Sequence, residues 1–245
     1  MDRLIYIAGS GAKQVLERQA SNSNNLANAS TPGFRAQIDL FKAVSVQSDG
    51  LATRSFAVDT TAGVDLTDGT IQETGKDLDV AIQGDGWLAV QTADGKEAYT
   101  RQGGLHVDEN GVLQTASGAS VIGDGGPITI PPDVKVAIAK DGTVSATTIG
   151  PNSTTSEIGR IKVVNIDKNN VERRDDGLFR TKDGSTPEAD STVVLVGGAL
   201  EGSNVNPVDA MVNMISLSRQ FDMQMKMLTN AESNATKAAQ ILSVT

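Results

Sequence analysis

Residues 206–243 read NPVDAMVNMISLSRQFDMQMKMLTNAESNATKAAQILS, and this run decides the fold class. Asn206 suits the N-cap of a helix, Pro207 its first position and Asp209 a capping-box position, so the run predicts a helix over 207–243. Residues on one face of that helix recur at alternating spacings of three and four, which is typical of a helix that packs against another helix. These positions are Met211, Met214, Ser218, Phe221, Met225, Leu228, Glu232, Ala235, Ala239 and Leu242.

The opposite end of the chain carries the same spacing and predicts a second helix over residues 3–28. Its seam positions are Ile5, Ala8, Ala12, Val15, Gln19, Asn22 and Leu26. Asn is a poor helix-interior residue, and this helix is rich in Asn near its end, so it should be marginally stable alone. Thr31-Pro32-Gly33 ends it. We therefore expect the two terminal helices to pair as a coiled-coil-like domain made of residues 1–31 and 203–245.

Between the helices the period of the hydrophobic pattern changes to two. Residues 77–202 contain short apolar runs separated by Asp-Gly or Asn-Gly pairs, which favour tight turns between antiparallel strands. Strands are predicted at 87–91, 105–107, 112–113, 128–130, 134–138, 143–145, 161–164 and 193–195. This segment predicts an all-β sandwich or open barrel, and residues 32–76 read as an extended connector. The fold class is therefore α+β, with two terminal helices and an inserted β domain.

Composition excludes several classes of function. The chain has 245 residues, 21 basic and 30 acidic, and its net charge is −9. Because phosphate binding requires clustered Lys and Arg, this balance argues against a nucleic-acid partner. No apolar run reaches the roughly 18 residues that span a bilayer, so direct membrane insertion is not expected. The first residues lack the features of a secretory signal peptide, so export, if it occurs, should proceed without a cleaved signal.

Candidate catalytic and metal-binding residues all have simpler explanations. His106 is the single histidine and lies in a predicted strand. The Asp residues that precede Gly are explained by turns, and residues 167–172 lack the Gly of a calcium loop. Gly9-Ser10-Gly11-Ala12-Lys13 does not have the P-loop spacing, and Arg173-Arg174-Asp175-Asp176 reads as a solvated turn. We predict no enzyme activity, no cofactor and no metal.

Four local motifs are more specific than these patterns. They are Asn24-Asn25-Leu26-Ala27-Asn28-Ala29-Ser30-Thr31-Pro32-Gly33-Phe34, Asp79-Val80-Ala81-Ile82-Gln83-Gly84-Asp85-Gly86-Trp87, Tyr99-Thr100-Arg101-Gln102-Gly103 and Leu200-Glu201-Gly202-Ser203-Asn204-Val205-Asn206. These motifs resemble those of the flagellar basal-body rod and hook protein family. Trp87 stands where the family usually has Phe. Residues 32–37 and 219–226 are most similar to the proximal rod members of the family. The signature residues that we carry forward are Asn24, Asn25, Leu26, Ala27, Asn28, Thr31, Gly33, Phe34, Glu201, Ser203, Asn204 and Val205.

The resemblance implies a structural subunit that polymerises helically through its terminal helices into a hollow drive shaft and transmits torque. It implies other proximal and distal rod subunits as partners. It also implies passage through the flagellar type III export apparatus to the periplasmic part of the basal body. Under this interpretation, the seam positions of the two helices are the assembly interface.

Two alternatives stay open at this point. The chain could be another rod or hook subunit of the same family, such as a distal rod protein. From a different class, it could be a secreted β-rich adhesin or carbohydrate-binding protein. That function would need an exposed aromatic platform and a signal peptide, and the sequence has neither.

Overall fold

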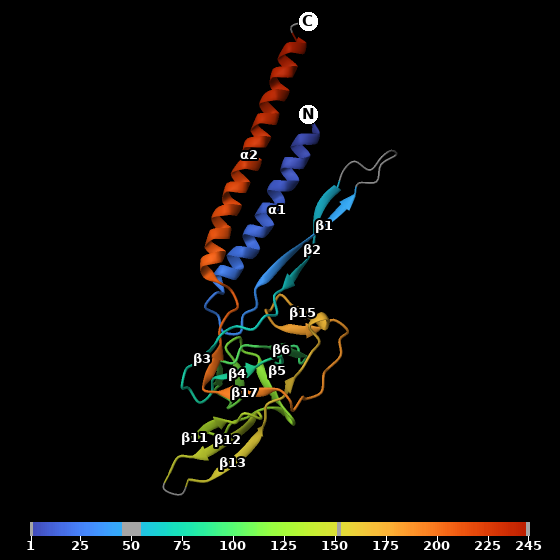
Figure 1. Ribbon diagram of the computed structural model, residues 1–245. Helices are drawn as coiled ribbons and strands as arrows, with labels where there is room; N and C mark the ends of the chain where they lie inside the picture. Colours follow the sequence, from blue (N-terminus) through green and yellow to red (C-terminus); the bar gives the residue numbers. More distant parts are fainter. Residues whose placement is uncertain (1, 46–54, 151–152, 244–245) are drawn as a thin grey trace. The chain divides into compact units, whose positions relative to one another are not determined.

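Figure 1 shows the computed structural model of the chain, which describes residues 2–45, 55–150 and 153–243. The chain divides into two compact units. The helical unit contains residues 1–29, 36–65 and 205–245, and the β unit contains residues 30–35 and 66–204. The short segment 30–35 thus belongs to the β unit although it directly follows the first helix.

Two helices form the helical unit, and both lie where the sequence predicts them. Helix α1 is Asp2–Ala27, and helix α2 is Pro207–Ser243. They run side by side and antiparallel, as Figure 1 shows in blue and red. Asn22 Nδ2 donates a hydrogen bond to Ala210 O at 2.7 Å, and Gly11 lies against the side chain of Gln224. The predicted N-cap is confirmed, because Asn206 Oδ1 accepts the amide of Val208 at 3.0 Å.

The face of α2 that packs inside the chain is shifted from the predicted one at alternate positions. We call it the inner seam; its buried or half-buried members are Ala210, Met214, Leu217, Phe221, Gln224, Leu228, Ala231, Ala235 and Ala238. Met214, Phe221, Leu228 and Ala235 were predicted. Met211, Ser218, Met225, Glu232 and Ala239 are exposed instead. At alternate positions the observed residue lies one position before the predicted one, so the observed face is turned by roughly 50° around the helix from the predicted face. The pattern favours Met at these positions because Met is more apolar than the small Ala and polar Gln that face α1.

Residues 37–45 and 55–64, within the segment predicted as an extended connector, form two paired antiparallel strands, which we call the hairpin. Strand β1 (Gln37–Ser45) pairs with β2 (Ser55–Val64), from Gln37 opposite Val64 to Ser45 opposite Ser55. A register shift between Leu40 and Phe41 marks a bulge, which bends the ribbon and increases its twist. An isolated two-stranded hairpin is marginally stable in water, so its attachment to α1 matters.

The β unit contains short strands whose pairings are all antiparallel. They are β3 (Ile71–Glu73), β4 (Val80–Gln83), β5 (Trp87–Gln91), β6 (Glu97–Thr100), β7 (Leu105–Val107), β8 (Leu113–Thr115), β9 (Ser120–Gly123), β10 (Gly126–Pro127), β11 (Val134–Ile138), β12 (Thr143–Thr148), β13 (Thr155–Arg160), β14 (Val163–Val164), β15 (Val171–Arg173), β16 (Phe179–Thr181), β17 (Val194–Gly197) and β18 (Ala199–Glu201). One 3-10 helix, η1, is Lys168–Asn170.

A nine-stranded sheet is the centre of the β unit. It follows the order β15-β16-β6-β5-β9-β8-β7, with β10 beside β9 and β14 beside β5. Three smaller sheets have the orders β11-β12-β13, β17-β4 and β18-β3. The predicted α+β chain with an inserted β-rich domain is therefore confirmed. The predicted strand at 128–130 is wrong, because only Thr129 makes a bridge, to Val112.

One hydrophobic core joins the nine-stranded sheet to the β11-β12-β13 and β17-β4 sheets. Side chains that alternate inward along the strands are removed from water, which supplies the main favourable free energy of folding. The core residues are Val80, Ile82, Leu88, Leu105, Leu113, Val121, Ile128, Ile130, Val136, Val144, Ile161, Val163, Val193 and Leu195. Val193 and Leu195 come from the C-terminal end of the β unit's sequence, so the core is complete only when these late residues are in place.

The predicted turns are confirmed at most of the Asp-Gly and Asn-Gly pairs. The glycine has a positive φ at Gly86, Gly95, Gly111, Gly142, Gly177 and Gly184, whereas at 124–126 Gly126 takes that conformation. The Asp side chains hold these turns: Asp141 accepts from Thr143, and Asp183 accepts from Ser185 at 3.0 Å from the backbone amide. The carboxylates are thus engaged with the backbone of their own turns.

Candidate functional site

The predicted seam of α1 lies largely against the rest of the helical unit. Ala8, Ala12 and Val15 are buried, and Gln19, Asn22 and Leu26 are half-buried. Ile5, the outermost position, is 37% exposed. The face of α1 that the sequence selects is therefore occupied, at least in its middle, by contacts within one chain.

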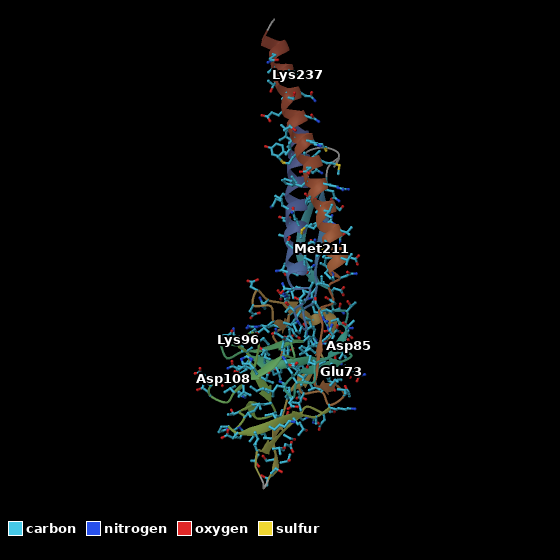
Figure 2. The ribbon with its side chains drawn as sticks, turned by 90° about the vertical axis from the view of Figure 1, so that its left-hand side faces the viewer. Glu73, Asp85, Lys96, Asp108, Met211 and Lys237 are labelled. Atoms are coloured by element: carbon cyan, nitrogen blue, oxygen red, sulfur yellow. The ribbon has the colours of Figure 1, made fainter. Side chains whose placement is uncertain are left out.

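On α2 the predicted positions divide between two faces. Met214, Phe221, Leu228 and Ala235 belong to the inner seam. Met211, Ser218, Met225 and Ala239 point to solvent, and Figure 2 labels Met211 on α2. The side chain of Leu242 lies outside the described residues.

The start of α2 carries an exposed apolar stripe beside the inner seam. We call it the outer stripe; its members Val208, Met211, Val212 and Ile215 are 66%, 54%, 60% and 56% exposed. Spacings of three and four place all of them on one face of the helix. Helix α1 also exposes Tyr6 and Leu16, at 71% and 50%. Apolar residues gathered at helical spacing on an exposed face are typical of protein contact surfaces.

The Asn residues at the end of α1 have specific partners that the sequence pattern does not reveal. Asn25 Nδ2 donates to Gln37 O at 2.9 Å, and the Gln37 amide donates to Asn25 Oδ1 at 2.8 Å. Asn22 reaches α2 through Ala210 O, and Asn28 Nδ2 donates to Asn24 O at 2.9 Å. Asn is costly inside a helix, but here each of these side-chain amides makes a hydrogen bond to a backbone group.

The signature residues of the β unit meet around the buried carboxylate of Glu201. Arg35 Nη1 lies 2.7 Å from Oε1 and Arg101 Nη1 lies 3.0 Å from Oε2. The Gly69 amide donates to Oε1 at 2.9 Å, and the Gly33 amide donates to Glu201 O at 2.8 Å. We call these residues, Gly33, Arg35, Gly69, Arg101 and Glu201, the junction cluster. Four segments distant in sequence are joined there.

Two glycines in the junction cluster are required by close backbone approach. A Cβ on Gly33, whose φ is +70°, would lie 2.4 Å from Arg101 O, and one on Gly69 would lie 2.0 Å from Gly202 O. Any side chain at either position would collide with the main chain. The Gly of the N-terminal signature is thus explained by close contact with the backbone of Arg101 and Gln102, directly after β6.

Aromatic rings cover the guanidinium groups of this region. The Arg101 guanidinium lies 5.5 Å from the Trp87 ring centre, and Trp87 packs on Phe179 at 4.5 Å. The Arg173 guanidinium lies 4.7 Å from the ring centre of Phe34, and burial lowers the pKa of Arg173. Both contacts fit cation–π geometry. Arg173, which we interpreted as part of a solvated turn, instead packs on the signature aromatic residue.

Sequence reasoning missed Arg35, Arg101 and Arg173 as structural residues. Arg101 and Glu201 lie in two of the four family motifs. Because a buried Arg requires a carboxylate partner, Glu201 was the one signal in the sequence that could have indicated this ion pair. Within the described chain no group of three His, Cys, Asp or Glu side chains is placed to hold a metal ion. His106 is exposed on β7, as expected for a surface strand. No helix of the described residues is long and apolar enough to cross a membrane.

Comparison with known proteins decides the family. Family models match residues 5–35 (flagella basal body rod protein), 81–146 (flagellar hook protein FlgE/F/G D1 domain) and 196–241 (flagellar basal body rod FlgEFG protein C-terminal). The flagellar basal-body rod protein FlgF of Salmonella typhimurium is 48% identical over 251 residues, covering 100% of both chains. The chain belongs to the flagellar basal-body rod protein family. FlgF of Escherichia coli is 47% identical, again over 100% of both chains.

Within the family the chain is FlgF-like. The flagellar basal-body rod protein FlgG of Bacillus subtilis is 31% identical over 260 residues, covering 95% of this chain and 96% of FlgG. The FlgF-like assignment rests on the identities of 48% and 47% over whole chains. This FlgF-like rod protein is a structural subunit of the basal body and not an enzyme. The adhesin alternative is not favoured.

Proposed function

We propose that this FlgF-like subunit polymerises helically in the proximal rod through α1 and α2, forming part of the hollow shaft that transmits torque. Its neighbours are copies of itself and other proximal and distal rod subunits. It reaches the periplasmic part of the basal body through the flagellar type III export apparatus, without a cleaved signal. The whole-chain similarity to relatives named FlgF and FlgG and the rod-protein family models that match residues 5–35 and 196–241 support this proposal.

The observation that carries the proposal is the outer stripe. The inner seam of α2 is occupied by α1 of the same chain, in the coiled-coil-like pairing that we propose for the two helices. Val208, Met211, Val212 and Ile215 are left exposed in a single subunit. Removing four such side chains from water stabilises a contact by about 25 cal/mol for each Å² of apolar area. A neighbouring subunit is the occupant that a rod protein supplies.

This assignment divides the predicted assembly residues into two functional classes. Ala8, Ala12, Val15, Met214, Phe221 and Leu228 hold the two helices of one subunit together. Met211, with the flanking residues of the outer stripe, contacts the neighbouring subunit. Tyr6 and Leu16 of α1 present a comparable exposed face at the other helix. Helices that are marginal alone gain stability as these faces are covered in the assembly.

The function is tested by locating the chain in isolated basal bodies. Cells that lack the protein should build no rod beyond the point that this subunit occupies and should not swim, and the wild-type gene should restore both. Quantitative mass spectrometry of purified basal bodies should detect the chain in a fixed ratio to other rod subunits. A chain that is absent from basal bodies with complete rods would exclude a rod function.

A further inference from the structure

Glu201 is a buried charge that unites residues from both ends of the β unit. Its side chain is 1% exposed, as is that of Arg35, and the side chain of Arg101 is 3% exposed. Besides the two guanidinium groups, its carboxylate accepts the Gly69 amide at 2.9 Å. Nothing in the assembly of the rod requires this carboxylate, because it lies inside a single subunit.

Both arginines depend on Glu201 for charge compensation. Asp68 is the other carboxylate near them, at 3.2 Å from Arg35 and 3.6 Å from Arg101, but its side chain is 48% exposed. The Nε atoms of Arg35 and Arg101 already lack a hydrogen-bond partner. Removing the Glu201 carboxylate would leave two buried guanidinium groups with the exposed Asp68 carboxylate as their remaining ion-pair partner, which is unfavourable. The folded positions of segments 30–35 and 99–103 are therefore destabilised when Glu201 is absent.

The strands around Glu201 are also the last of the β unit along the chain. Strand β17 supplies Leu195, which is fully buried in the core, and pairs with β4 over four residues. Strand β18 pairs with β3 from Ala199 opposite Glu73 to Glu201 opposite Ile71. The Gly202 amide then donates to Thr70 O at 2.8 Å. Residues 193–202 thus contribute apolar packing, two strand pairings and the buried charge.

We propose that residues 193–202 are the closing segment of the β unit. The unit does not fold until this segment is present, because its buried arginines require the carboxylate of Glu201. A chain that ends earlier contains β3 to β16, but its two buried arginines lack their buried carboxylate partner and its core is unfilled. During any delivery of the chain from its N-terminus, the β unit stays unfolded until about four-fifths of the sequence has appeared. This inference does not depend on how the subunit assembles.

Truncated chains test the requirement for the closing segment. Trp87 is the single tryptophan, is buried beside Arg101 and Phe179, and reports the folding of the β unit by its fluorescence. Chains of residues 1–192, 1–204 and 1–245 are compared in urea. We expect a cooperative Trp87 transition for 1–204 and 1–245 and none for 1–192. A cooperative transition for 1–192 would overturn the proposal, and so would its loss in 1–204, which would assign the requirement to α2.

Full-length variants test the role of the charge. Glu201→Gln keeps the size and an acceptor oxygen but removes the charge, and should lower the melting temperature of the Trp87 signal by about 10 °C. Glu97→Gln is the matched control, because Glu97 pairs with half-buried Lys162 at 2.8 Å inside the central sheet. It should cost less than half of that shift. Equal shifts for the two variants, or none for Glu201→Gln, would overturn the assignment of Glu201.

Discussion

Asn25 and Gln37 are joined by a pair of hydrogen bonds in which a side-chain amide takes the place of a neighbouring strand. Asn25 Nδ2 donates to Gln37 O at 2.9 Å, while Gln37 N donates to Asn25 Oδ1 at 2.8 Å. Gln37 is the first residue of β1, so this contact fixes the root of the hairpin to α1. The Asn of the family signature thus connects two elements of the helical unit.

Replacing Asn25 should free the root of the hairpin. Asn25→Asp keeps the acceptor but removes the donor, so one of the two bonds is lost and Gln37 O loses its partner. We expect the free energy that holds the start of β1 against α1 to fall by about 1–2 kcal/mol. Hydrogen exchange of the Gln37 amide measures it. Ser23→Ala, an exposed change on the same helix, is the control; equal exchange in both variants would contradict the role of Asn25.

Two glycines with the same backbone conformation should respond differently to alanine. Gly33 and Gly75 have φ of +70° and +69°, but a Cβ on Gly33 would meet Arg101 O at 2.4 Å, whereas Gly75 has open space around it. Gly75→Ala should lower the unfolding free energy of the β unit by about 1 kcal/mol, from the left-handed conformation alone. Gly33→Ala adds a main-chain collision and should cost about 3 kcal/mol or more. Urea unfolding followed by Trp87 compares them, and equal costs would refute the contact at Gly33.

Acid should destabilise the β unit through its turn carboxylates. Hydrogen bonds from the backbone and hydroxyl of Ser185 lower the pKa of Asp183 to about 2, and bonds from Thr143 lower the pKa of Asp141. A carboxyl group whose pKa is lower in the folded state contributes stability above its unfolded value, near 3.8, and loses it as the pH falls through the folded value. The melting temperature should therefore be flat down to about pH 5 and then fall between about pH 4 and pH 2.

Calorimetry across that pH range measures the effect. Asp183→Asn removes one titrating carboxylate, so its melting temperature should depend less steeply on acid than that of the wild type. A melting temperature that rises on acidification, or an unchanged slope in the variant, would be inconsistent with these pKa shifts.

The sequence predicts those features that local residues determine. The cap at Asn206 and Pro207 placed the start of α2, and the Asp-Gly pairs placed most of the turns, because each signal acts within a few residues. The face of α2 was shifted, because Met211 and Met225 look more apolar than Ala210 and Gln224, which face α1. Strand β1 and its pairing with β2 were missed because residues 37–45 lack a clean alternation of apolar and polar residues.

The junction cluster could not be assembled from the sequence for a different reason. Arg35, Arg101 and Glu201 are separated by 66 residues or more along the chain, and no periodic pattern relates residues so far apart. Only the rule that a buried guanidinium needs a carboxylate links them, and burial itself is a property of the fold. The Asn residues were likewise judged by helix propensity, whereas tertiary partners decide their role.

The assembly claim rests on the difference between neighbouring faces of α2, and paired variants measure it. Ile215→Asp changes an exposed residue of the outer stripe, Leu217→Asp changes a buried residue of the inner seam, and Asn230→Asp adds the same charge at an exposed polar position. Circular dichroism of purified monomers should show normal helix content for Ile215→Asp and Asn230→Asp, and a loss for Leu217→Asp, which buries an unpaired charge.

The most direct measurement is swimming, with electron microscopy of basal bodies, in cells whose only copy of the gene carries Ile215→Asp. We predict a soluble, folded subunit, no rod beyond the point that this subunit occupies and no swimming, because the charge would be buried at a contact between subunits. Asn230→Asp cells should swim. Normal rods and normal swimming with Ile215→Asp would contradict assembly through the outer stripe of α2.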